Sequence, residues 1–169
     1  MSRMSSTATG FGAILLWSLL ALFTVGSAPV PPFLLNALTF GLGGLVGLIW
    51  LVLSGGFGHL AGVRPVVFVL GAIGLFGYHA LYFSALRLAP PAEAGLISYL
   101  WPLLIVLFSG LLPGERLTPL HLMGALVAFA GTGTLVLGGG AGPSADAMAG
   151  YGLALAAALT WAAYSVVSR

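Results

Sequence analysis

The sequence contains no cysteine and no lysine. Without cysteine the chain cannot form a disulfide, a thiol nucleophile, an iron–sulfur cluster or a cysteine-bound zinc site. Charge is scarce as well, because Asp, Glu, Lys and Arg make up 5% of the 169 residues, against about 25% in soluble domains. So few charges cannot cover a water-soluble globule. The net charge of +2 offers no basic surface, which excludes nucleic acid as a partner.

Apolar residues dominate instead, since 60% of the chain is hydrophobic and the mean hydropathy is +1.14. A transmembrane helix needs about 20 mostly apolar residues, and clusters of proline and glycine divide the chain into windows of that length. The six windows are 8–27, 33–53, 65–86, 94–112, 118–137 and 149–168. They predict an all-α integral membrane protein with six transmembrane helices in a lipid bilayer.

Two other interpretations of the apolar windows compete with this one. Arg3, the apolar stretch that follows it and the small residues Gly26 and Ala28 resemble a signal peptide. Pro29 would follow the cleavage site, however, and would hinder cleavage. The windows could also be buried helices of a soluble protein, but too few polar residues remain to cover them.

The arginines predict the orientation in the membrane, because cytoplasmic loops are enriched in Lys and Arg. If the N-terminus is cytoplasmic, Arg3, Arg64, Arg116 and Arg169 lie on the cytoplasmic side and only Arg87 lies outside. We therefore expect a multi-pass protein whose N-terminus faces the cytoplasm.

The sixth window resembles the first. An offset of 144 residues aligns Trp17 with Trp161, and a Gly-aromatic-Gly triplet occurs near the start of each window. These windows would cross the membrane in opposite directions, so a five-helix unit followed by its own first helix would be an inverted repeat, which is typical of transporters. A chance alignment of two tryptophans is the alternative. The expected parts are a five-helix unit at 1–137, an outer loop at 138–148 and the first helix of an incomplete second unit at 149–169.

One ionisable side chain, His79, lies deep in a window, and such residues are often functional. Residues three or four positions apart are neighbours on a helix, so we expect Tyr78, His79 and Tyr82 to form one stripe that faces a solute pathway. The alternative is a histidine bonded to a carbonyl of a neighbouring helix. Asn36 is likewise either a solute contact or a hydrogen bond to a neighbouring helix. Gly43 and Gly47 form a small-residue step that predicts close helix packing.

A proline interrupts the fourth window near its centre. Pro102 removes one backbone donor and frees the carbonyl of Ser98, and an unpaired carbonyl in a membrane is tolerated where protein or a water-lined cavity supplies a partner. Trp17 and Trp161 also lie near mid-span, away from the headgroup region where tryptophan is common. We therefore expect one aromatic cavity that reaches from the midplane toward the outer face. Its expected substrate-binding residues are Trp17, Tyr78, His79, Tyr82, Tyr99, Trp101, Pro102 and Trp161.

Several motifs together resemble a known family. They are Ala-Leu-Arg-Leu-Ala-Pro-Pro-Ala-Glu-Ala at 85–94, Pro102, Gly-Glu-Arg-Leu at 114–117, His121 and Gly124. This pattern closely resembles the EamA repeat of the drug/metabolite transporter superfamily, strongly over the third to fifth windows and loosely elsewhere. Tyr-Leu-Trp-Pro at 99–102 looks like the YddG-type aromatic amino-acid exporters within that superfamily.

The resemblance implies a ten-helix transporter fold made of two inverted five-helix repeats. It also implies export of aromatic and related amino acids across a bacterial inner (plasma) membrane, by alternating access around a central cavity. The partner is then a small-molecule solute, and no cofactor is implied. Since six helices are expected here, the resemblance implies that a further segment or chain supplies the rest of the second repeat.

Two other classes of function are weighed against a transporter. An intramembrane enzyme needs a nucleophile with a base or a metal cluster, but His79 stands alone in its window, and neither Gly-x-Ser-x-Gly nor His-Glu-x-x-His occurs. We therefore expect no catalytic residue and no metal ligand. A non-transporting membrane subunit that needs a partner chain is the second hypothesis.

Overall fold

The computed structural model describes residues 3–60, 62–138 and 144–168. Helices account for all the regular structure in these ranges, and no strand occurs in them. The elements in chain order are α1 (Arg3–Ser18), α2 (Leu20–Gly26), α3 (Pro32–Leu53), α4 (Phe57–Leu60), α5 (Pro65–Gly71), the π-helical turn η1 (Ala72–Phe76), α6 (Gly77–Leu88), α7 (Pro91–Ser98), α8 (Trp101–Ser109), α9 (Pro119–Leu137) and α10 (Ala145–Val167).

Among the residues that the structure describes, five helical segments are long and apolar enough to cross a membrane. They are Ser5–Gly26, Pro32–Leu53, Pro65–Leu88, Pro91–Ser109 and Ala145–Val167. The expectation of an all-helical protein with several such segments is confirmed. The remaining window, at 118–137, also forms one long helix, the 19-residue α9.

Prolines lie at the start of several of the described helices. Pro32, Pro65, Pro91, Pro102 and Pro119 each lie in the first turn of a helix, where the missing N–H removes no hydrogen bond. Side chains cap the two C-terminal helices. The Ser144 hydroxyl accepts from the backbone N–H of Ala147 at the start of α10, and Thr118 and His121 cap α9 reciprocally.

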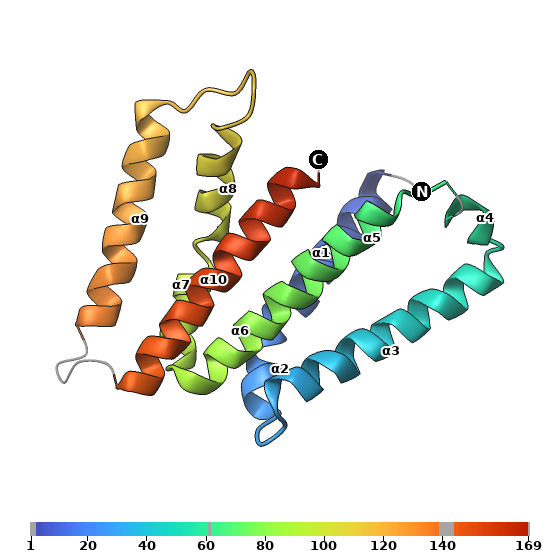
Figure 1. Cartoon of the computed structure of the whole chain (residues 1–169), viewed down its shortest axis with the longest axis horizontal. Helices are drawn as coiled ribbons and strands as arrows, with labels where there is room; N and C mark the ends of the chain where they lie inside the picture. Colours follow the sequence, from blue (N-terminus) through green and yellow to red (C-terminus); the bar gives the residue numbers. More distant parts are fainter. Residues whose placement is uncertain (1–2, 61, 139–143, 169) are drawn as a thin grey trace.

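The long helical segments, in which α1 continues into α2, α5 into α6 and α7 into α8, run in alternating directions along the chain (Figure 1). In Figure 1 the links α3–α5 and α8–α9 lie at the edge that holds both chain ends, whereas the links α2–α3 and α6–α7 lie at the opposite edge. Arg64 and Arg116 belong to the first two links, and Arg87 lies in the last turn of α6 at the other edge. Arg64 and Arg116 therefore lie at one edge of the structure, and Arg87 lies at the opposite edge.

Helix α10 lies at the centre of the core and contacts α6, α7 and α8. Its small residues make this packing close, because Ala154, Ala157, Ala158 and Ala162 are fully buried. At Gly150 a Cβ atom would lie 2.8 Å from the backbone nitrogen of Ala89. By contrast, in the described parts of α1, α2 and α3 the buried residues are Thr24 and Asn36.

Polar side chains join helices at separate points in this core. The Asn36 amide donates to the carbonyl of Phe76 at 3.1 Å, so of its two expected roles the structure shows the hydrogen bond to a neighbouring helix. The Arg87 guanidinium donates to the carbonyls of Val25 and Val30 and to the Ser27 hydroxyl, which holds the α2–α3 link against the end of α6.

A hydrogen bond between Tyr151 and Glu93 joins α10 to α7, and its removal should lower the stability of the protein. The Tyr151 hydroxyl donates to the Glu93 carboxylate, and a hydrogen bond to a charged group contributes about 1.5 to 3 kcal/mol. We expect Tyr151→Phe to lower the midpoint of thermal unfolding in detergent. Tyr164→Phe on the same helix is the control, because the Tyr164 hydroxyl makes no hydrogen bond in the described part of the chain. Equal midpoints for the two variants would contradict a stabilising role for the bond.

Candidate functional site

The fourth transmembrane segment is interrupted at mid-length, as the proline predicted. Helix α7 ends at Ser98 and α8 begins at Trp101, with Pro102 in its first turn. In the break the N–H of Leu100 donates to the carbonyl of Ile97 at 3.1 Å. Buried Ser98 also donates its hydroxyl to the carbonyl of Ala154 on α10. The break therefore lies against α10. Tyr99 lies within the break and Trp101 at its end, so the break determines the direction of both side chains.

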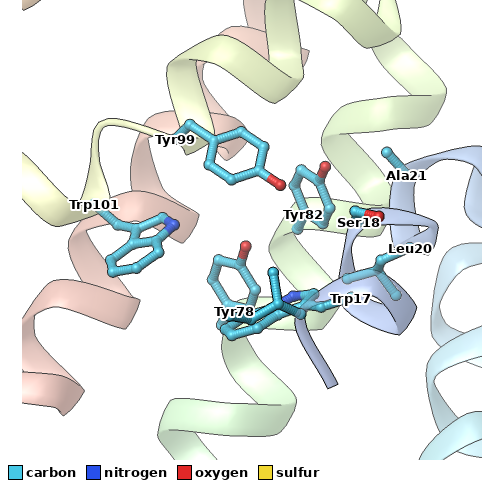
Figure 2. Close-up of a pocket in the computed structure, with 9 residues that line it drawn as sticks. Trp17, Ser18, Leu20, Ala21, Tyr78, Tyr82, Tyr99 and Trp101 are labelled. Carbon is cyan, nitrogen blue, oxygen red and sulfur yellow. The ribbon is translucent and has the colours of Figure 1, made fainter. Parts of the chain in front are cut away.

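A cavity of about 280 Å³ lies beside this break and is called the central hollow here. Figure 2 shows the rings that surround it, from α1, α6, the break after α7 and the first residue of α8, with the smaller side chains of α2 at one side. The lining residues are Ile14, Trp17, Ser18, Leu20, Ala21, Tyr78, Tyr82, Tyr99 and Trp101. Trp17 and Tyr99 are 41% and 58% exposed, so the hollow is open at these two rings.

The central hollow offers neutral hydrogen-bond donors. In Figure 2 the hydroxyls of Tyr78 and Tyr99 and the indole nitrogen of Trp101 face the space between the rings. The hydroxyls of Tyr78, Tyr82 and Tyr99 have no hydrogen-bond partner among the residues that the structure describes. Ser18, in contrast, donates its hydroxyl to the carbonyl of Leu15 at 2.7 Å. No lining residue is charged, so a ligand would meet phenol and indole donors in aromatic surroundings.

Trp161 of α10 packs against three of the rings that line the hollow. Its ring centroid lies 4.8 Å from that of Tyr78, 5.5 Å from that of Trp17 and 6.2 Å from that of Trp101. Such tilted and edge-to-face contacts stabilise an aromatic pair by about 0.5 to 1.5 kcal/mol beyond burial. Trp161 does not line the hollow, but it contacts three of the five rings that do.

His79 lines a different cavity from Tyr78 and Tyr82, although its ring contacts that of Tyr78 edge on. Tyr78 and Tyr82 lie four residues apart and stack at 5.7 Å, whereas His79 lines a different cavity against α3. The physical reason is the helical turn of about 100° per residue, which directs residue 79 away from the face shared by 78 and 82. Pro102 is also outside the lining of the hollow and is exposed; its role is to begin α8.

Sequence reasoning missed four lining residues on the first transmembrane segment. Ile14 and Ala21 lie three residues before and four residues after Trp17, so they share its helix face. That spacing was available in the sequence and would have identified both. Ser18 and Leu20 lie beside the interruption between α1 and α2, which no residue pattern indicated. Among the described residues no three His, Asp or Glu side chains gather as a metal site requires.

Comparison with known proteins identifies relatives over the whole chain. The sequence pattern of the EamA-like transporter family matches residues 4–137. The chain is 57% identical over its full length to the aromatic amino acid exporter YddG of Ancylobacter novellus and 30% identical to that of Escherichia coli, covering 60% of each. A protein of known crystal structure matches 99% of the chain at 55% identity with a TM-score of 0.68, over 59% of its own length.

The chain thus spans about 60% of the length of the relatives it matches. The family pattern covers well over half of the chain, and these relatives are named as exporters rather than as enzymes. Both the resemblance drawn from the sequence and the expectation of a protein that is not an enzyme are confirmed. The chain belongs to the EamA-like transporter family, within the drug/metabolite transporter superfamily, and is homologous to the YddG aromatic amino acid exporters.

Proposed function

We propose that the protein exports small solutes, above all aromatic and related amino acids, across a bacterial inner membrane. The solute binds in the central hollow, which opens to each side of the membrane in turn. The observation that carries the proposal is the set of aromatic rings in the hollow, drawn from separate helices, with tyrosine hydroxyls that have no partner among the described residues. The names of the homologous exporters support the choice of solute.

The chemistry of the hollow suits a zwitterion with a flat apolar side chain. The phenol and indole donors of Tyr78, Tyr82, Tyr99, Trp17 and Trp101 bind the carboxylate, and the ring faces attract the ammonium group. The solute ring packs edge to face against the same side chains. Trp161 holds the rings in position, and the Pro102 break directs Tyr99 and Trp101.

We further propose that the chain is part of a ten-helix fold of two inverted five-helix repeats. Residues 1–137 form the first repeat with α9 as its fifth span, 138–148 an outer loop, and 149–169 the first helix of the second repeat. In support, α10 runs opposite to α1 and α2 in Figure 1, and the aligned residues Trp17 and Trp161 are in contact, as equivalent residues near a two-fold axis would be. The segregation of the described arginines supports a cytoplasmic N-terminus.

A competition experiment tests the solute class. In proteoliposomes that contain the protein, we expect efflux of radiolabelled L-tryptophan to be inhibited by an excess of L-phenylalanine or L-tyrosine. L-lysine and L-glutamate should inhibit weakly, because no charged residue of the hollow would pair with a charged side chain. Equal inhibition by all four amino acids would contradict the proposed selectivity. Absence of efflux from the isolated chain would favour a subunit that needs a partner chain.

A further inference from the structure

A second cavity of about 370 Å³ lies between α3 and α6, and we call it the side groove. Its volume lies within the range of small-molecule sites. Leu20 lines both this groove and the central hollow, so its side chain lies between the two cavities. The lining residues of the side groove are Leu20, Thr39, Phe40, Gly43, Gly44, His79 and Phe83.

The hydrogen bond of His79 determines what its ring offers to the groove. The Nδ1 atom lies 2.7 Å from the carbonyl oxygen of Leu75, and a carbonyl can only accept, so Nδ1 carries the proton. The ring meets Phe40, Tyr78 and Phe83 edge on, at centroid distances of 5.2, 4.9 and 5.6 Å. These apolar surroundings disfavour the charged imidazolium form of the ring. Its Nε2 atom is then an acceptor, and it has no partner in the described part of the chain.

Thr39 provides a second hydrogen-bond acceptor in the groove, and Gly43 and Gly44 form a flat part of its wall. The Thr39 hydroxyl donates its proton to the carbonyls of Leu35 and Asn36, which leaves its oxygen lone pairs as acceptors. A Cβ atom at Gly43 or Gly44 would meet no other described atom within 4 Å. No described helix packs closely against these two glycines, and the bare backbone of α3 offers a surface on which a planar ring can lie.

We propose that the side groove is a second binding site, which takes a flat neutral molecule bearing one N–H or O–H donor, such as an indole or a phenol. The donor bonds to Nε2 of His79, and the ring lies on Gly43 and Gly44 between Phe40 and Phe83. The chemistry is complementary to that of the central hollow, which presents donors, whereas the groove presents acceptors. The proposal does not depend on transport, since it concerns equilibrium binding only.

Photolabelling with 5-azidoindole tests the site in the protein reconstituted in phospholipid nanodiscs. We expect mass spectrometry to locate adducts within residues 39–44 of α3, and an excess of indole to suppress them. 1-Methylindole has the same ring system but carries a methyl group in place of the N–H hydrogen, so we expect it to compete about fivefold less well, as the loss of one neutral hydrogen bond predicts. His79→Leu should weaken the competition by indole by a similar factor, while His79→Gln keeps an acceptor oxygen and most of the affinity.

Two further variants distinguish this groove from the central hollow. Gly43→Leu fills the groove and should abolish the adducts at 39–44, whereas Trp101→Ala alters only the central hollow and should leave them unchanged. Equal competition by indole and 1-methylindole would overturn the proposal, because the N–H donor would then make no bond in the groove. Loss of the adducts in Trp101→Ala, or no adducts at 39–44 in the unaltered protein, would also overturn it. The comparison of the two indoles needs no variant, so it holds even if His79→Leu fails to fold.

Discussion

Trp101→Ala is expected to weaken the binding of L-tryptophan about 10- to 100-fold. The substitution removes an indole ring that lines the central hollow and the N–H that faces its space. Loss of an aromatic contact and one hydrogen bond amounts to about 1.5 to 3 kcal/mol, and each 1.4 kcal/mol is tenfold in affinity. Equilibrium binding of radiolabelled L-tryptophan to the purified protein measures the effect.

The matched control is Trp50→Ala on α3. Trp50 is 68% exposed and does not line the central hollow, so its loss should leave the affinity unchanged within about twofold. Thermal unfolding of both variants checks that each is folded. Unchanged affinity in folded Trp101→Ala would count against the central hollow as the solute site.

Gly150→Val is expected to destabilise the protein by about 3 kcal/mol, which is near the upper end of the range for overpacking a close contact. A Cβ at Gly150 would lie 2.6 Å from the Cβ of Ala89 and 2.8 Å from its backbone nitrogen. Neither atom can rotate away, because both belong to the backbone or are attached directly to it. Helix α10 would have to move away from the α6–α7 link and so disturb its packing on both helices. The midpoint of thermal unfolding in detergent measures the change.

Gly152→Val is the control for this prediction. Gly152 lies two residues after Gly150 on the same helix, and a Cβ atom at Gly152 would meet no other described atom within 4 Å. Valine and glycine differ little in helix propensity, so we expect a nearly unchanged midpoint. Similar losses at both positions would show that the effect arises from valine in α10 and not from the contact with Ala89.

Much of the fold could be predicted from residue patterns along the chain. Apolar windows and proline clusters marked the helices, and Pro102 marked the break between α7 and α8. These are local effects, since each depends on the chain within a few residues. The aromatic residues of the central hollow could be named for the same reason, because tryptophan and tyrosine near mid-span are unusual wherever they occur.

Hydropathy and proline act over a few residues, so residue order is enough to predict a helical membrane protein with aromatic side chains near the middle of its apolar windows. Which of those side chains share a cavity depends on tertiary contacts. His79 and Tyr78 are adjacent in sequence but line different cavities, and Trp161 contacts Trp17 across 144 residues. Such assignments depend on the rotation and approach of whole helices, which arise from contacts such as Gly150 on Ala89 between segments far apart in the chain.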